Sequence, residues 1–459
     1  MSYDLIVVGG GPAGYVGAIR AAQLGKKAVC VEKERAGGTC LNWGCIPTKS
    51  LLRNAELYSL LTHHSGEFGL SFDKLAFDWG KVISRSRDVS DKNASGVEFL
   101  FKKNKIDYIR AEATIDKAGA VTAKFPDGKT ETLTAPRMLV STGVTSRPLP
   151  GLPFDGKRVI GSREAMVLQP QPKSMIIIGA GAIGVEFAYF FNSFGTKVTL
   201  VEMMPNILPV EDTEISQTLE KSLSKQGIRI LTNTKTTKTE VTDTGVKIGV
   251  EGKESETLEA EVCLVAIGVQ PLLAPGKLKL DLTERGYIKT DDNYQTSAPG
   301  IYAAGDIIGP PWLAHVASYE AIQAVNGMFG AAKPKRVTVF PGCTYCQPQV
   351  ASVGLTERAA KEKGIAYKVG KFPYMASGKA RAVGDTEGFV KLIIGEPHGE
   401  VLGAHIIGAE ATELIAELGL AITLEATADE IDATIHAHPT LSEMVHEASE
   451  QAYGHAIHI

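Results

Sequence analysis

The chain of 459 residues has little cysteine, no excess of charge of one sign and no long apolar run. Six cysteines in this length do not resemble the disulfide framework of a small extracellular protein. The 48 basic and 52 acidic residues are intermixed, and no basic stripe favours nucleic acid as a partner. No apolar run is long enough to span a bilayer, and no signal or transit peptide is visible. The length predicts two to four domains. These absences predict a cytoplasmic protein in which any disulfide is catalytic.

A complete dinucleotide-binding pattern occupies the beginning of the chain. A short apolar strand precedes Gly9, Gly11 and Gly14, a helical stretch follows, and a second strand ends at Glu32. Glycines at this spacing permit a tight turn, close approach to a pyrophosphate and close packing of helix on strand. The helix start favours the phosphate charge, and the terminal carboxylate can accept hydrogen bonds from a ribose. The pattern therefore predicts a first bound nucleotide.

The same pattern recurs in the middle of the chain. Another apolar strand precedes Gly179, Gly181 and Gly184, and the strand that follows the next helix ends at Glu202. A carboxylate at this position pairs with a free ribose 2′-hydroxyl and repels a 2′-phosphate. Residues 203–205 supply no arginine that would bind such a phosphate. The second site is therefore predicted to bind NAD rather than NADP.

Two cysteines, Cys40 and Cys45, follow the first pattern within residues 37–52. On a regular helix, residues five apart rise about 7.5 Å along the axis. That rise exceeds the usual Cα separation in a disulfide. A bend at residues 43–44 is therefore expected, with Pro47 in the first turn of the helix that follows. A dithiol at this spacing closes a small, readily reduced ring that can exchange electrons with a nearby cofactor.

The remaining segments predict an α/β protein with two Rossmann-like domains and a C-terminal α+β domain. The expected elements are a mostly helical stretch at 49–103, strands at 106–115 and 121–125, a strand and turn at 138–143, a linker at 148–153, strands at 262–268 and 300–306, and an α+β region from about 337 onward.

Five features in this order resemble the flavin disulfide oxidoreductases with an active-site dithiol. They are the two glycine motifs, residues 39–49, Gly305-Asp306 and residues 436–443. The resemblance covers essentially the whole chain and is strongest to the branch that oxidises dihydrolipoamide. It implies a homodimer with FAD as the first nucleotide and NAD as the second. It also implies lipoyl-bearing carrier or acyltransferase proteins, of 2-oxo-acid dehydrogenase or glycine-cleavage complexes, as partners.

The resemblance also implies three domains and their boundaries. The FAD domain would contain residues 1–147 and 271–335, the NAD domain 148–270, and the C-terminal interface domain 336–459.

The resemblance implies four residues of a thiol-exchange site. Cys40 would form a mixed disulfide with the substrate, and Cys45, nearer the flavin, would become the thiolate that passes electrons onward. His438 would be the base that deprotonates the substrate thiol, because a thiol is a poor nucleophile until it loses its proton. Glu443 would orient and charge the imidazole. In this family the histidine comes from the partner subunit. His436 has no predicted proton-transfer role.

Lys49 and Glu186 are a second pair implied by the resemblance, with the lysine near the flavin and the glutamate as its partner. The alternative for each is a solvated charge on a helix. The full set of FAD contacts implied is Gly9, Gly11, Gly14, Glu32, Thr39, Lys49, Ala113, Thr142, Gly143, Asp306, Leu313, Ala314 and His315. The NAD contacts implied are Gly179, Gly181, Ile183, Gly184, Glu186, Glu202, Thr236 and Gly268.

The other cysteines carry no predicted chemistry. Cys343 and Cys346 lack a second cysteine pair or a nearby histidine in sequence, so no metal site is expected there. Cys30 and Cys263 lie in apolar strands and are expected in the core. Two alternatives compete with the main interpretation. One is a glutathione or mercuric reductase that uses NADPH, and the other is an interaction protein that has kept the fold but lost catalysis.

Overall fold

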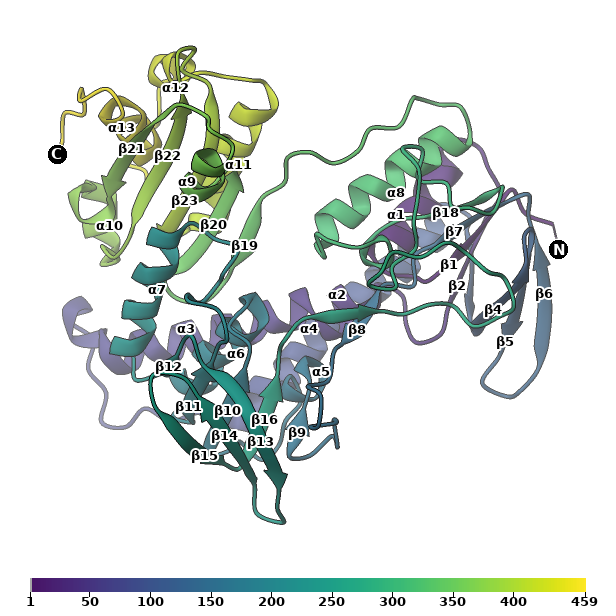
Figure 1. The fold of residues 1–459 in the computed structure, drawn as a ribbon, viewed down its shortest axis with the longest axis horizontal. Coiled ribbons are helices and arrows are strands. Elements are labelled where there is room, and N and C mark those ends of the chain that lie inside the picture. The colour runs from purple at the N-terminus through teal and green to yellow at the C-terminus, as the bar shows by residue number, and fades with distance from the viewer. Residues whose placement is uncertain (1) are drawn as a thin grey trace. The chain divides into compact units, whose positions relative to one another are not determined.

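The chain forms two compact units in the computed structural model, which describes residues 2–459 (Figure 1). The first unit contains residues up to Ser50, Gly80–Arg147 and Gly268–Thr338, and the second contains Leu51–Trp79, Pro148–Ile267 and Val339–Ile459. Across residues 2–459, no helix is both long enough and apolar enough to span a membrane.

The first unit is organised around a parallel sheet with the strand order β18-β7-β1-β2-β3. Its strands are β1 (Leu5–Val8), β2 (Ala28–Glu32), β3 (Asp107–Arg110), β7 (Arg137–Val140) and β18 (Ile301–Ala303). Successive side chains of a strand point to opposite faces, so β1 contributes to two cores. Leu5 and Val7 join a cluster with residues of the helices, whereas Ile6 and Val8 join a cluster with residues of a small antiparallel sheet.

Helices of the first unit cover one face of this sheet. They are α1 (Pro12–Gln23), α2 (Gly38–Trp43), α4 (Trp79–Lys103, whose first residue belongs to the second unit) and α8 (Ala314–Met328). The short η2 (Asp306–Ile308) contributes Ile307 to the core on the other face. α1 and α8 lie side by side (Figure 1). A Cβ atom at Gly17 of α1 would be 2.6 Å from Leu139 Cδ2 and 3.5 Å from the Ala321 methyl group, so a small residue is needed at this crossing.

The other face carries the antiparallel sheet β4 (Glu112–Lys117), β5 (Ala120–Lys124) and β6 (Thr130–Thr134). A two-stranded ribbon joins β8 (Val144–Ser146) to β17 (Val269–Pro271). The strand region expected at 106–115 is divided at Ala111 between two sheets, with β3 in the parallel sheet and β4 in the antiparallel one. β6 was not among the predicted strands.

The nucleotide-binding pattern of the second unit lies on the parallel sheet β12-β11-β10-β16-β9. Its strands are β9 (Val159–Ile160), β10 (Ser174–Ile178), β11 (Lys197–Val201), β12 (Arg229–Leu231) and β16 (Val262–Val265). The antiparallel strands β13 (Lys235–Val241), β14 (Val246–Glu251) and β15 (Ser255–Ala260) form a separate sheet. The helices are α3 (Cys45–His63, which begins in the first unit), η1 (Ser65–Phe68), α5 (Ser162–Ala165), α6 (Ala182–Ser193) and α7 (Thr213–Lys225).

The C-terminal part of the second unit is an antiparallel sheet with helices, as predicted for an α+β region. The strand order is β19-β20-β23-β22-β21, with β19 (Gly342–Thr344), β20 (Gln349–Gly354), β21 (Tyr367–Pro373), β22 (Phe389–Gly395) and β23 (Val401–Gly408). α11 (Ala411–Thr423) packs on β20 and β23, and α13 (Glu443–Gln451) packs on β21 and β22 (Figure 1). The remaining helices are α9 (Glu357–Glu362), η3 (Tyr374–Ala376), α10 (Gly378–Val383) and α12 (Ala428–Ala433). The predicted fold class is confirmed, whereas the predicted domain boundaries stay a prediction.

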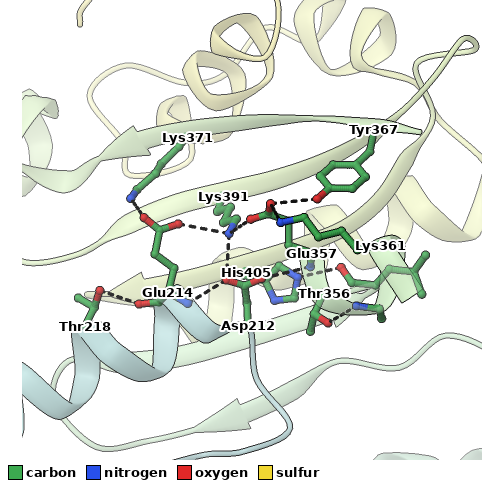
Figure 2. A network of polar contacts seen from close by, with 12 residues as sticks. Asp212, Glu214, Thr218, Thr356, Glu357, Lys361, Tyr367, Lys371, Lys391 and His405 are labelled. Carbon is green, nitrogen blue, oxygen red and sulfur yellow. Dashed lines mark hydrogen bonds and ion pairs between the residues drawn. The ribbon is translucent and has the colours of Figure 1, made fainter. Parts of the chain in front are cut away.

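A buried lysine joins α7 to the C-terminal sheet (Figure 2). Lys391 on β22 is 2 % exposed, and its ammonium group contacts three carboxylates. The Nζ atom lies 2.9 Å from Asp212, the N-cap residue of α7, 3.2 Å from Glu214 and 2.9 Å from Glu357 at the start of α9. Lys371 on β21 also pairs with Glu214. One cation therefore holds two helix starts against one strand.

The charges of this cluster stabilise one another. Burial alone would lower the pKa of Lys391, but hydrogen bonds from Lys391 to Glu357 and Asp212 raise it above its ordinary value. The hydrogen bond from Lys391, aided by Lys361, lowers the pKa of Glu357 to about 2. Both partners are therefore ionised at neutral pH, and the cluster contributes stability only while the carboxylates keep their charge.

We expect Lys391→Met to lower the free energy of unfolding by about 3–5 kcal/mol, because it leaves buried carboxylate charge without a cation. Lys371→Met is the matched control, since its side chain is 38 % exposed and its loss should cost less than about 1 kcal/mol. Urea unfolding at pH 7 measures both. The pKa of Glu357 is lowered by folding, so its contribution is present above about pH 4.5 and is lost as the pH falls toward 2. The difference in free energy of unfolding between wild type and Lys391→Met should therefore shrink as the pH falls. A difference that stayed constant over this range would show that the ion pair with Glu357 does not contribute this stability.

Candidate redox and nucleotide sites

The two cysteines of the predicted dithiol lie on consecutive helices. Cys40 lies in α2, Cys45 is the first residue of α3, and Gly44 breaks the helical path between them with φ −144° and ψ −116°. A Cβ atom on residue 44 would lie 3.0 Å from the Thr39 carbonyl oxygen and 3.2 Å from the Cys40 Cα atom. Glycine relieves this crowding, and the bend expected at residues 43–44 is present.

The bend brings the two sulfur atoms within hydrogen-bonding contact of each other. The hydrogen bond with Cys45 and burial raise the pKa of the Cys40 thiol, negative charge on Cys45 adds to the shift, and the Lys49 ammonium group partly offsets it. Lys49 lies one helical turn after Cys45 on α3, where its cation favours an anion at this site.

Two side chains of α4 hold the end of α2 that carries the dithiol. Arg87 Nη1 donates a hydrogen bond to the Asn42 carbonyl oxygen at 2.8 Å, and its guanidinium carbon lies 4.7 Å from the centre of the Trp43 ring. Ser90 Oγ donates to the Leu41 carbonyl oxygen at 2.8 Å. A helix of six residues leaves its last carbonyl groups without partners inside the helix, and α4 supplies them.

Sequence reasoning did not find Arg87 and Ser90, because each is more than 40 positions from the carbonyl group that it binds. One signal was available. The buried stripe of α4 carries Ser86 and Ser90 between apolar residues, and small polar residues on a buried stripe require local partners. These serines indicate that α4 makes polar contacts on its buried side, but they do not show which segment of the chain provides the partner.

The first glycine turn has the geometry that its sequence predicts. Gly9 has φ +101°, and a Cβ atom there would lie 2.4 Å from the Ser141 carbonyl oxygen. A Cβ atom on Gly14 would lie 1.8 Å from the Gly9 carbonyl oxygen. Gly11 is the N-cap of α1, and no side chain caps this helix. Its first N–H groups are therefore oriented toward an anion such as a pyrophosphate.

Polar groups near this turn fit the hydroxyl groups of a nucleotide cofactor. One Glu32 oxygen accepts the Gly10 N–H at 2.7 Å and the other accepts the Glu34 N–H at 2.8 Å, which leaves each oxygen a lone pair for a ribose. Among the described residues, the buried Thr142 Oγ1 has no hydrogen-bond partner. Burial raises the pKa of Asp306 to about 6, so a hydroxyl donor would stabilise its ionised form. These groups suit the predicted FAD.

Every residue predicted to contact FAD belongs to the first compact unit. Thr39 precedes Cys40 in α2, Ala113 is a buried residue of β4, and Gly143 follows β7 with φ +71°. Leu313 is the N-cap of α8, which also lacks a side-chain cap, and Ala314 and His315 form its first turn.

The second glycine turn repeats the first. Gly179 has φ +100°, and a Cβ atom there would lie 2.5 Å from the Ala266 carbonyl oxygen. A Cβ atom on Gly184 would lie 1.9 Å from the Gly179 carbonyl oxygen. Gly181 is the N-cap of α6, again without a side-chain cap. The start of α6 is therefore a second position suited to a pyrophosphate.

The carboxylates of this unit have defined partners. Glu202, 9 % exposed, accepts the Ala180 N–H at 2.7 Å and the Met204 N–H at 2.8 Å. Glu186 on α6 is 4 % exposed and accepts the Tyr345 N–H at 2.9 Å, so it is not the solvated helix charge that was its alternative. The other predicted NAD contacts are Ile183, exposed in the first turn of α6, Thr236 on β13, and Gly268, which has φ +104° and belongs to the first unit.

The predicted base and its carboxylate form a hydrogen-bonded pair. His438 precedes α13, and Glu443 is the first residue of α13. His438 Nδ1 lies 2.8 Å from Glu443 Oε1, and Glu443 Oε2 accepts the Thr440 N–H at 2.9 Å. Burial opposes the shift, but the hydrogen bonds from Thr440 and His438 lower the pKa of Glu443. An ionised Glu443 takes the Nδ1 proton as its hydrogen-bond donor, which leaves Nε2 as the proton acceptor. The His438 side chain is 81 % exposed.

The neighbouring histidine and the other cysteines have structural contacts. His436 Nε2 lies 2.7 Å from Glu417 and its Nδ1 lies 3.1 Å from the Thr434 carbonyl oxygen, so both ring nitrogens are engaged. Cys346 is fully buried and contacts the Pro348 carbonyl oxygen, and Cys343 lies in β19. Cys30 and Cys263 are fully buried in β2 and β16, which confirms their predicted place in the core.

Two family descriptions match nearly all of the chain. Residues 3–321 match the pyridine nucleotide-disulphide oxidoreductases, and residues 340–449 match the dimerisation domain of the same family. Among curated relatives, the dihydrolipoyl dehydrogenase of Chlorobaculum parvum is 47 % identical over 454 residues, which cover 97 % of this chain and 96 % of the relative. The dihydrolipoyl dehydrogenase of Bacillus subtilis is 43 % identical, with 99 % of both chains covered.

Solved structures agree with these matches. The crystal structure of LpdA from Mycobacterium tuberculosis superposes with a TM-score of 0.89 at 25 % identity, covering 97 % of this chain and 99 % of LpdA. A copper(II) complex of RclA, a HOCl-induced flavoprotein disulfide reductase from Escherichia coli, superposes with a TM-score of 0.87 at 25 % identity, covering 99 % of both chains.

We expect Arg87→Met to loosen the end of α2 and to lower the effective concentration of one thiol at the other. The disulfide should then be easier to reduce, with a potential about 30 mV less negative for each tenfold loss. Equilibration with dithiothreitol redox buffers, followed by thiol alkylation, measures the shift. Lys92→Met is the matched control, because Lys92 is an exposed cation on the same helix. Equal potentials in Arg87→Met and Lys92→Met would show that the contact to the Asn42 carbonyl does not position the dithiol.

Proposed function

The chain belongs to the pyridine nucleotide-disulphide oxidoreductases, and on that premise we propose that it oxidises protein-bound dihydrolipoyl groups to the lipoyl disulfide with NAD as the final acceptor. The observation that carries the proposal is the dithiol, whose Cys40 and Cys45 side chains are in hydrogen-bonding contact across the bend at Gly44. A pair that meets in this way can alternate between disulfide and dithiol without a large movement of the chain. The full-length relatives named dihydrolipoyl dehydrogenase support the choice of substrate.

The exchange begins with the Cys40–Cys45 disulfide and a substrate dithiol. His438 Nε2 removes a proton from one substrate thiol, and the resulting thiolate attacks Cys40 Sγ, which releases Cys45 as a thiolate. The second substrate thiol then attacks the substrate sulfur of the mixed disulfide, the bond from that sulfur to Cys40 breaks, and the proton of the second thiol passes to Cys40. The lipoyl disulfide leaves, Cys40 becomes a thiol, and the enzyme holds the electron pair in its dithiol. The chemistry that a bound FAD would supply is the two-electron transfer that links this dithiol to NAD.

Other residues of the chain position this chemistry. Glu443 holds the His438 tautomer and stabilises its protonated form. The Lys49 ammonium group stabilises negative charge near Cys45, and Glu186 is proposed as its partner in the family arrangement. Residues 1–147 and 271–335 would bind FAD, 148–270 would bind NAD, and 336–459 would form the subunit interface.

We infer that the active form is a homodimer in the cytoplasm. Its substrates would be lipoyl groups carried by lipoyl-bearing carrier or acyltransferase proteins. The match of residues 340–449 to the family's dimerisation domain supports the dimer. In the dimer, His438 and Glu443 of one subunit would act on Cys40 and Cys45 of the other. The high exposure of His438 within a single chain is consistent with a side chain that serves a partner.

We expect His438→Gln to reduce turnover of dihydrolipoamide by about 10²–10⁴-fold, the usual scale of general-base catalysis. FAD content and reduction of the enzyme by NADH should be unchanged, because neither step needs this base. Glu443→Gln should lose less, since Glu443 acts through the imidazole. Steady-state and stopped-flow assays of the purified protein measure these effects.

Mixing the His438→Gln chain with a Cys45→Ser chain tests the shared site. Heterodimers would contain one intact site and one doubly damaged site, and should recover about half of the activity of the unmutated dimer. Failure to recover activity after verified chain exchange would place His438 in the site of its own chain.

We expect catalytic efficiency to favour NAD over NADP by about ten- to hundredfold. A 2′-phosphate beside the Glu202 carboxylate would bring two negative charges together, and this repulsion would cost about 1–3 kcal/mol of binding free energy. Glu202→Gln removes the charge and should narrow the preference. Steady-state measurement of kcat/KM with NAD and with NADP gives the nucleotide preference. Assays with glutathione disulfide in place of lipoamide test the disulfide substrate. Equal use of NADP by the wild type, together with reduction of glutathione disulfide, would favour the NADPH-dependent alternative.

A further inference from the structure

Three metal-binding side chains converge between α12 and α13, in a part of the C-terminal region that the proposed chemistry does not use. They are Asp432 of α12 and His446 and Glu450 of α13, and one ligand atom from each lies within 4.8 Å of the others. His446 and Glu450 are four residues apart, so they lie on one face of the helix, one turn apart. An imidazole and two carboxylates are ligands that zinc-class divalent cations accept.

The two facing ligand atoms are buried and lack hydrogen bonds. Asp432 Oδ1 and His446 Nδ1 are sealed from solvent, and neither has a hydrogen-bond partner among the described residues. They lie 3.8 Å apart, which is too long for a hydrogen bond. Two ligands at about 2.0–2.2 Å from a tetrahedral zinc ion lie about 3.3–3.6 Å apart, so a small side-chain shift would let both atoms reach one ion. The separation therefore suits two ligands of one ion better than a direct contact.

A cavity beside this cluster provides access for an ion. It has a volume of about 290 Å³, and Asp432, Glu450, His398 and His455 are among the residues that line it. His455 Nδ1 lies 3.7 Å from Glu450 Oε2, within reach of a fourth coordination position. A divalent cation would balance the two carboxylate charges that meet here.

We propose that Asp432, His446 and Glu450 bind a divalent transition-metal ion of the zinc class, with His455 or water as a further ligand. The ion would tie the end of α12 to α13. These helices flank residues 434–442, the segment that contains His438. Metal binding would therefore restrain both ends of this segment. The metal site follows from its own ligands and does not depend on the proposed function.

The test uses the FAD-loaded protein with its Cys40–Cys45 pair oxidised, so that these thiols do not compete for zinc. After treatment with EDTA, calorimetric titration with ZnCl₂ should show a site that His446→Ala weakens at least about tenfold, about 1.4 kcal/mol. Glu450→Gln, which keeps the size of the side chain, should act in the same direction. His63→Ala, at an exposed histidine outside the cluster, should bind zinc as the wild type does.

Hydrogen exchange of the same proteins tests the tie between the helices. Zinc should slow exchange of residues 434–442 in the wild type and in His63→Ala, and should have no such effect in His446→Ala. Zinc affinity that is equal in wild type and His446→Ala would overturn the site and leave Asp432 and His446 as an ion pair. Binding that is lost in His446→Ala but never slows exchange in the wild type would overturn the proposed restraint of the segment.

Discussion

The proposed dithiol chemistry depends on one geometric constraint, that two cysteines five positions apart must reach disulfide distance. A continuous helix cannot satisfy it, because the rise between such residues is too large. The chain ends α2 at Gly44, where a side chain would crowd Cys40, and begins α3 at Cys45. Breaking a helix exposes its last carbonyl groups, and Arg87 and Ser90 of α4 bind them. The end of α2 next to the bend is thus held in place by side chains of a helix more than 40 positions away in sequence.

A second constraint acts on both glycine turns, because the chain must turn sharply with the following helix packed closely against it. Both turns satisfy this constraint with glycines at the same two positions. The first glycine of each motif has φ near +100°, and the third lies where a Cβ atom would be less than 2 Å from the first glycine's carbonyl oxygen. A glutamate ends the following strand in the first unit and comes directly after it in the second, and its two oxygens accept backbone N–H groups of the turn and of the next loop. Glu32 and Glu202 therefore have a structural role, holding the turn in shape, in addition to the ribose contact that their position predicts.

The parts that sequence predicts well are those set by short-range geometry. The glycine turns and the bend at residues 43–44 follow from the spacing of nearby residues. The pairing of His438 with Glu443 was instead implied by the resemblance to a family, and the two side chains do form a hydrogen bond. The parts that it missed depend on distant contacts, such as the 179 positions between Lys391 and Asp212. The strand expected at 106–115 shows a different limit. Its composition suits a strand throughout, but the division between two sheets at Ala111 is decided by packing.

The pKa values of three carboxylates show which acidic groups have their stabilising partners within the chain. Lys391 lowers the pKa of Glu357, and Thr440 together with His438 lowers that of Glu443, so these acids have their partners inside the protein. Asp306 behaves in the opposite way, because burial raises its pKa to about 6 and is only partly offset by a hydrogen bond from its own backbone. A folded protein keeps such a group at a cost in stability unless a ligand supplies the donor. Asp306 lies in the same unit as the first glycine turn, where a cofactor hydroxyl can supply it. A hydroxyl donor of FAD should therefore lower the pKa of Asp306.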